Sequence, residues 1–144
     1  MVAGTPMREV TLRLPMLPNM EIEASKAATS MAEEMQMSPD KIDEVRMAVV
    51  EACINAYEHS NAPDRELHLS VAMLGDEQPE RLCVTVRDNG TGFLPESVQK
   101  PSIEDKFRSS NKRGWGLTII RGLMDEVEIR SGAQGTTVVM YKSR

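Results

Sequence analysis

Aromatic residues are nearly missing from this sequence. They make up 3% of it, so the core has to consist of aliphatic side chains and methionine, of which there are 11. Cysteine is also rare, and Cys53 and Cys83 each lie inside an apolar stretch, which is typical of buried thiols in a reducing compartment. Cysteine and histidine nowhere occur at the spacing of a metal site, which excludes a zinc-type centre.

Long apolar runs are absent as well. No stretch approaches the roughly 20 residues of a membrane-spanning helix. The first residues lack the basic region and apolar run of a signal peptide. We therefore expect a cytoplasmic protein that does not contact a membrane.

The sequence has no excess of positive charge. Lys and Arg number 17 against 22 Asp and Glu, a formal net charge of −5, which argues against nucleic-acid binding. The 144 residues, 40% hydrophobic and 27% charged, fit one soluble globular domain. We expect a single domain over residues 1–144, with residues 1–6 as a flexible tail.

The hydrophobic pattern predicts strands and helices in a defined order. Alternation predicts a strand from Arg8 to Leu14, and Asn19 can cap a helix that runs to about Met37 with Ile22 on its buried face. Ser38 and Pro39 are a helix start signal. The remaining predicted elements are a helix over 39–60, strands over 66–74 and 81–88, a helix over 114–124, and a hairpin over 127–142. This order predicts an α/β (α+β) two-layer sandwich, with a mostly antiparallel mixed sheet and helices on one face.

Glu51 and Asn55 stand four residues apart, so they share one face of the predicted second helix. An asparagine inside a helix lowers helix propensity, and its amide needs a partner if it is half-buried. A metal would satisfy the amide oxygen, because Mg²⁺ takes hard oxygen ligands. Glu51 could accept a proton from a hydroxyl or a water. The alternative is that both side chains lie on the solvent-facing side of the helix.

A glycine-rich turn follows the third predicted strand. It reads Asp-Asn-Gly-Thr-Gly, with Asp88 at the strand end and Gly90 and Gly92 after it. Glycine lets a ligand approach the backbone closely, and the aspartate could accept a hydrogen bond from an exocyclic amine such as that of adenine. An ordinary Asn-Gly turn is the alternative.

A long polar segment separates this turn from a second glycine pair. Residues 93–113 show little apolar periodicity, and a loop of this length inside a compact domain is usually functional or mobile. Arg113 adds positive charge at its end, and Gly114, Gly116 and Leu117 open a helix, whose free N–H groups bind phosphate well. No P-loop motif occurs. Thr136, in the last hairpin, is either part of a plain turn or a hydrogen-bonding group near Asp88.

The order of these motifs resembles the ATPase superfamily of gyrase, heat-shock chaperones, histidine kinases and mismatch-repair proteins, which share the Bergerat ATP-binding fold. Within it, the chain is most similar to the stand-alone serine/threonine kinases that act as anti-sigma factors. The resemblance covers Met7 to Tyr141. Its most specific parts are Glu-x-x-x-Asn-Ala-x-x-His at residues 51–59 and Gly-x-Gly-Leu followed by residues 124–127.

The resemblance implies a role for each motif residue. Asn55 would coordinate Mg²⁺ on the phosphates of ATP, and Glu51 would be the base that orients or deprotonates the acceptor hydroxyl. Asp88 would bind the adenine amine, with Gly90 and Gly92 leaving room and Thr136 supporting the contact. The residues on the phosphate side, which form the hinge of an ATP lid over 93–113, would be Arg113, Gly114, Gly116 and Leu117.

The resemblance therefore implies an ATP- and Mg²⁺-dependent protein-serine/threonine kinase that regulates transcription by partner switching. It implies two protein partners, a sigma factor held inactive and a small antagonist domain whose Ser or Thr is phosphorylated, and it suggests a homodimer. Two alternatives remain: a nucleotide-gated binding module without transfer activity, and a kinase of the same family in a signalling pathway without a sigma factor.

Overall fold

The computed structural model describes residues 6–59, 64–90, 116–133 and 135–144. These residues form one five-stranded sheet in the order β1-β2-β3-β5-β4. The strands are β1 (Pro6–Pro15), β2 (Glu66–Leu74), β3 (Arg81–Asp88), β4 (Glu126–Gly132) and β5 (Gly135–Ser143). Each pairing among them is antiparallel, where the sequence predicts a mostly antiparallel mixed sheet. Pro6 already belongs to β1, and residues 1–5 of the predicted tail lie outside the described residues.

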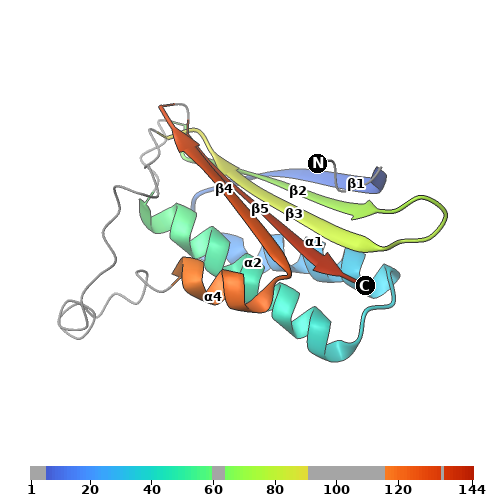
Figure 1. Ribbon diagram of the computed structural model, residues 1–144. Helices are drawn as coiled ribbons and strands as arrows, with labels where there is room; N and C mark the ends of the chain where they lie inside the picture. The colour runs from blue at the N-terminus through green and yellow to red at the C-terminus, as the bar shows by residue number, and fades with distance from the viewer. Residues whose placement is uncertain (1–5, 60–63, 91–115, 134) are drawn as a thin grey trace.

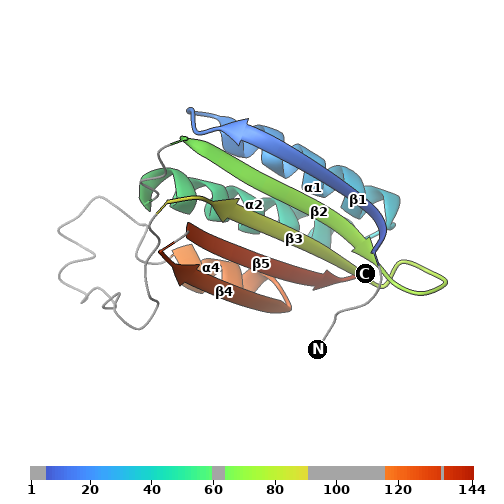
Figure 2. The ribbon, with the colours of Figure 1, turned by 90° about the horizontal axis from the view of Figure 1, so that it is seen from above.

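In the part of the chain that the structure describes, three helices cover one face of the sheet: α1 (Met20–Glu34), α2 (Pro39–His59) and α4 (Gly116–Leu123). Figures 1 and 2 show them in one layer, with α2 between α1 and α4. The described residues thus confirm the two-layer sandwich. No helix in this described part of the chain is both long and apolar enough to cross a membrane.

The core lies between the two layers because side chains alternate along each strand. The register aligns inward-facing residues into rows that cross all five strands. One row contains Leu12, Leu69, Val86, Val138 and Ile129. The next contains Val10, Val71, Val84, Met140 and Val127. Methionine fills the space that aromatic residues would otherwise occupy. Met31 of α1 and Met35, which follows the end of this helix, are both buried.

The two long helices begin differently. Ser38 caps α2, since its Oγ accepts a hydrogen bond from the N–H of Lys41 at 3.3 Å. Asn19 does precede α1, but it has φ 76° and its side chain makes no cap hydrogen bond, so the predicted side-chain cap is wrong. The predicted burial of Ile22 is also wrong, because 46% of this residue is exposed. Met20 and Ala24 lie on the buried face of α1 instead.

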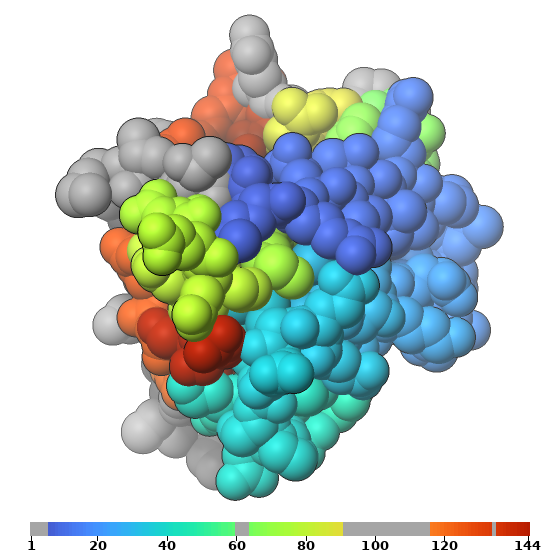
Figure 3. Space-filling model, turned by 90° about the vertical axis from the view of Figure 1, so that its right-hand side faces the viewer, coloured from blue at the N-terminus to red at the C-terminus, as the bar shows by residue number. Residues whose placement is uncertain are grey.

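The C-terminal residues are fixed against the start of α2. Lys41 Nζ donates to the carbonyl oxygens of Ser143 at 3.1 Å and Arg144 at 3.0 Å. The N–H of Arg144 donates to the carbonyl of Glu80 at 2.9 Å. In Figure 3 the dark red C-terminus accordingly lies between the β2–β3 loop and the first turns of α2. This end of the molecule is opposite to the end of α2 and the start of α4 (Figure 1).

Candidate functional site

The inward-facing side of the sheet becomes polar at one end. The row after Leu12 and Leu69 begins with Leu14 and Leu67, but it continues with Asp88, Thr136 and Ser131. Asp88 is 6% and Thr136 8% exposed. The Thr136 hydroxyl lies 3.0 Å from Ser131 Oγ. Polar groups this deep are usually paired or bind a ligand, so this row is a candidate binding surface.

Asp88 is held by the backbone around it. Its Oδ1 accepts a hydrogen bond from the N–H of Gly90 at 2.9 Å, and its Cα pairs with that of Thr136 across β3 and β5. Gly135 has φ +127°, and a Cβ there would lie 2.0 Å from the carbonyl oxygen of Asp88. Only glycine fits this close approach. Asp88, Gly90 and Thr136, predicted separately, therefore belong to one cluster.

Glu51 and Asn55 form a second cluster with the start of α4. A Cβ added at Gly116 would lie 3.1 Å from Glu51 Oε1 and 3.5 Å from Asn55 Oδ1. Gly116 is buried at the first position of α4, so the absence of a side chain lets this helix end approach both polar groups. Leu117 beside it is half-buried and packs against the core. The predicted helix pair and the second glycine motif thus meet, although they are far apart in sequence.

Asn55 is only half-exposed, and its Oδ1 is buried. Within the described part of the chain this oxygen accepts no hydrogen bond. Leaving a buried acceptor without a hydrogen bond costs about 1–3 kcal/mol, so a group outside these residues should complete it. A hard cation fits, because an amide oxygen is a suitable ligand for Mg²⁺. The alternative that the Asn55 side chain faces solvent is therefore wrong for its amide oxygen.

A second group of possible metal ligands consists of Asp64, Glu66 and His68, whose ligand atoms lie within 4.8 Å of one another. Asn89 Nδ2 donates to Asp64 at 3.0 Å and lies 3.2 Å from His68 Nε2. The hydrogen bond from Asn89 holds the pKa of Asp64 below its ordinary value. Because these groups already bond to protein partners, Asn55 is the better candidate for a metal.

Both clusters lie at the same end of the molecule. Figures 1 and 2 place the end of α2, the end of β3 and the start of α4 together there. Of the predicted site residues, those the structure brings to this end are Glu51, Asn55, Asp88, Gly90, Gly116, Leu117 and Thr136. Gly92, Arg113, Gly114 and the predicted lid over 93–113 lie outside the described residues. Ser131 was not predicted. Gly135 belongs to the Gly-Thr motif at residues 135–136, of which only Thr136 was predicted as a site residue.

Comparison with known proteins identifies this architecture. Residues 14–142 match the model of the histidine kinase-like ATPase domain family. The anti-sigma F factor of Clostridium acetobutylicum is 30% identical over 142 residues, which cover 94% of this chain and 95% of that protein. The serine-protein kinase RsbW of Bacillus licheniformis is 34% identical over 118 residues, covering 79% and 72% of the two chains.

A solved structure supports the same fold. The RsbU and RsbW domains of a Mycobacterium tuberculosis protein match 96% of this chain and 33% of that chain, with a TM-score of 0.69 and 22% identity. The chain belongs to the histidine kinase-like ATPase family, in the group that contains the anti-sigma F factors and the RsbW serine-protein kinases. This confirms the predicted family, the predicted fold and the predicted kinase class.

Proposed function

We propose that this protein is a Mg-ATP-dependent kinase that phosphorylates a Ser or Thr of a small antagonist protein and holds a sigma factor inactive. The observation that carries the proposal is the buried Asn55 Oδ1, which lacks a hydrogen bond among the described residues and faces Gly116 beside Glu51. The family membership and the relatives named above support the kinase and sigma-factor parts.

The residues of the polar row would bind the adenine. The N–H of Gly90 already occupies Asp88 Oδ1, which leaves Oδ2 to accept a hydrogen bond from the exocyclic amine. Thr136, beside Asp88 on the next strand, would support this contact. Gly90 and Gly92 would leave room for the base because they have no side chains. The buried position of Asp88 favours a specific contact over a solvated one.

The second cluster would act on the phosphates. Asn55 would hold the Mg²⁺, which when bound neutralises charge on the phosphate oxygens. The free N–H groups at the start of α4, at Gly116 and Leu117, would face the phosphates, as would Arg113 and Gly114 before them. Glu51 would orient the acceptor hydroxyl of the partner and accept its proton. Residues 93–113 would form the lid.

Phosphorylation would also release the antagonist. A phosphate adds about −1.5 to −2 charge, and this chain has a net charge of −5. Repulsion would therefore weaken the complex once the transfer is complete. We further propose that the protein is cytoplasmic, as partner switching with a sigma factor requires, and forms a homodimer. Sedimentation of the purified protein tests the homodimer directly.

The variants Glu51→Gln and Asn55→Ala test the catalytic assignment. Glu51→Gln should keep Mg-ATP affinity and lower transfer from labelled ATP to the antagonist by roughly 10²–10⁴, the usual contribution of a positioned acid–base group. Asn55→Ala should weaken both, since it removes the metal ligand.

Asp43→Asn is the matched control, because this carboxylate lies on the same helix and pairs with Arg46 at its exposed surface. Its transfer rate should equal that of the wild type. If the wild-type protein binds nucleotide and antagonist but transfers nothing, the kinase proposal is wrong and a nucleotide-gated binding module stands. If Glu51→Gln transfers as fast as wild type, Glu51 is not the base.

A further inference from the structure

Lys142 is a buried cation at the opposite end of β5 from Thr136. It is 6% exposed and, among the residues that the structure describes, it is the only buried basic one. It faces inward, in line with Thr136, Val138 and Met140. A buried ammonium group is tolerated only when it has good partners, so its contacts indicate what it does.

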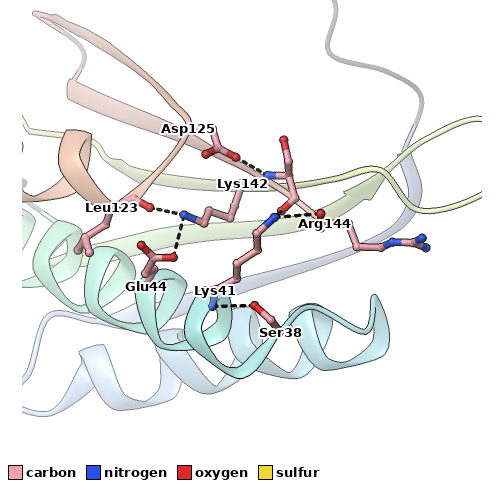
Figure 4. Close-up of polar contacts among 8 residues, drawn as sticks. Ser38, Lys41, Glu44, Leu123, Asp125, Lys142 and Arg144 are labelled. Carbon is pink, nitrogen blue, oxygen red and sulfur yellow. Dashed lines mark hydrogen bonds and ion pairs between the residues drawn. The ribbon is translucent and has the colours of Figure 1, made fainter.

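The partners of Lys142 lie on two helices. Its Nζ donates to the carbonyl oxygen of Leu123 at 2.6 Å and lies 3.2 Å from Glu44 Oε1 (Figure 4). Leu123 is the last residue of α4. Carbonyl oxygens at a helix end lack partners within the helix and carry partial negative charge, so the ammonium group caps α4 from the sheet and links it to α2.

α4 is connected to α2 at both of its ends, and the two helices have the same length between these two points. Gly116 lies against Glu51 at one end of α4, and Lys142 joins Leu123 to Glu44 at the other. Residues 116 to 123 and residues 44 to 51 each span about 10 Å along a helix. A shift at the Leu123 end would therefore move Gly116 along Glu51 and Asn55, because a short helix moves as a rigid body.

Between its two ends α4 is held by apolar packing, because Ile120 is buried and Leu117 and Leu123 pack against the core. Lys142 adds a polar contact at the end of the helix. The segment after it is fixed to β5, because Asp125 Oδ2 accepts a hydrogen bond from the N–H of Ser143 at 2.6 Å. We propose that Lys142 is a positioning residue, which holds the start of α4 against Glu51 and Asn55 and so sets nucleotide affinity from the far end of the helix. The nucleotide part rests on the proposed function.

Lys142→Met tests this role, because it keeps the buried aliphatic stem and removes only the ammonium group. We expect amide exchange at residues 120–124 of the free protein to be about 3- to 30-fold faster, and Mg-ATP binding to weaken by a similar factor. Exchange in β2 and β3 should not change.

Lys41→Met is the matched control. Lys41 belongs to the same network but donates to the carbonyls of Ser143 and Arg144 and not to α4 (Figure 4). It should leave exchange in α4 and nucleotide binding as in the wild type. Glu44→Gln, which leaves the hydrogen bond to Leu123, should have a smaller effect than Lys142→Met.

The outcomes separate this proposal from the proposed function. If amide exchange in α4 of the Lys142→Met variant is as slow as in the wild type, or if exchange is uniformly faster throughout the fold, the positioning role is overturned. Faster exchange in α4 with unchanged Mg-ATP affinity overturns its link to the site. If the wild type binds no nucleotide, the proposed function fails, and the exchange result alone decides whether Lys142 holds α4. If Lys142→Met does not fold, Lys142→Gln is measured in its place, with an intermediate effect expected.

Discussion

Asp88 is unusual among the inward-facing residues of β3, because the others, Leu82, Val84 and Val86, are apolar and buried. A carboxylate can occupy this place only because it lies at the last position of the strand, where the N–H of Gly90 donates to it. It therefore contributes little to the packed core, and its second oxygen can serve a ligand.

The variant Asp88→Asn should consequently lose ligand affinity and keep the fold. It replaces one acceptor oxygen with a donor, and a buried polar mismatch costs about 1–3 kcal/mol. We expect ATP affinity, measured by calorimetry, to fall by about 5- to 150-fold, with little change in the melting temperature. Unchanged affinity in the folded variant would reassign Asp88 to a structural turn.

At the scale of the elements, α4 contacts α2 at its first residue, Gly116, and Lys142 of β5 at its last, Leu123. The two glycines of α4 have different surroundings. Gly116 is buried against Glu51 and Asn55, whereas a Cβ at Gly122 would meet nothing within 4 Å. A side chain at Gly116 would crowd Glu51 on α2, whereas one at Gly122 would not crowd any described residue.

Alanine at these two positions should therefore have opposite effects. Gly122→Ala should stabilise the protein by up to about 1 kcal/mol through helix propensity and leave Mg-ATP affinity unchanged. Gly116→Ala places a methyl group 3.1 Å from Glu51 Oε1, and such overpacking typically costs about 1–3 kcal/mol. Nucleotide titration should show weaker binding for this variant only. Equal affinities would mean that α4 adjusts freely.

At the scale of the whole molecule, nucleotide should bind the folded state and stabilise it. At a ligand concentration about 100-fold above Kd the gain is about 2.7 kcal/mol, which raises the melting temperature of a domain of this size by roughly 5–10 °C. Excess chelator should remove most of the shift, because Asn55 is proposed to bind the metal. The same shift with and without Mg²⁺ would remove Asn55 from that role.

The elements themselves could largely be predicted from the sequence. The predicted strands over 66–74 and 81–88 agree with β2 and β3 to the residue, and Ser38-Pro39 does start α2. These features follow from side-chain alternation and local hydrogen bonds, which act over a few residues. Where the local signal was ambiguous the prediction was wrong, as at Asn19, which adopts a left-handed conformation that needs no side-chain cap.

Only the tertiary structure decided how the motifs combine. The insertion of β5 between β3 and β4 places Thr136 opposite Asp88, and the packing of α4 on α2 places Gly116 against Asn55. Lys142 was predicted only as part of a strand, and its burial depends on the helices above it. The physical reason is that local patterns determine which face of an element is apolar, whereas the partner of each face depends on how the whole chain packs.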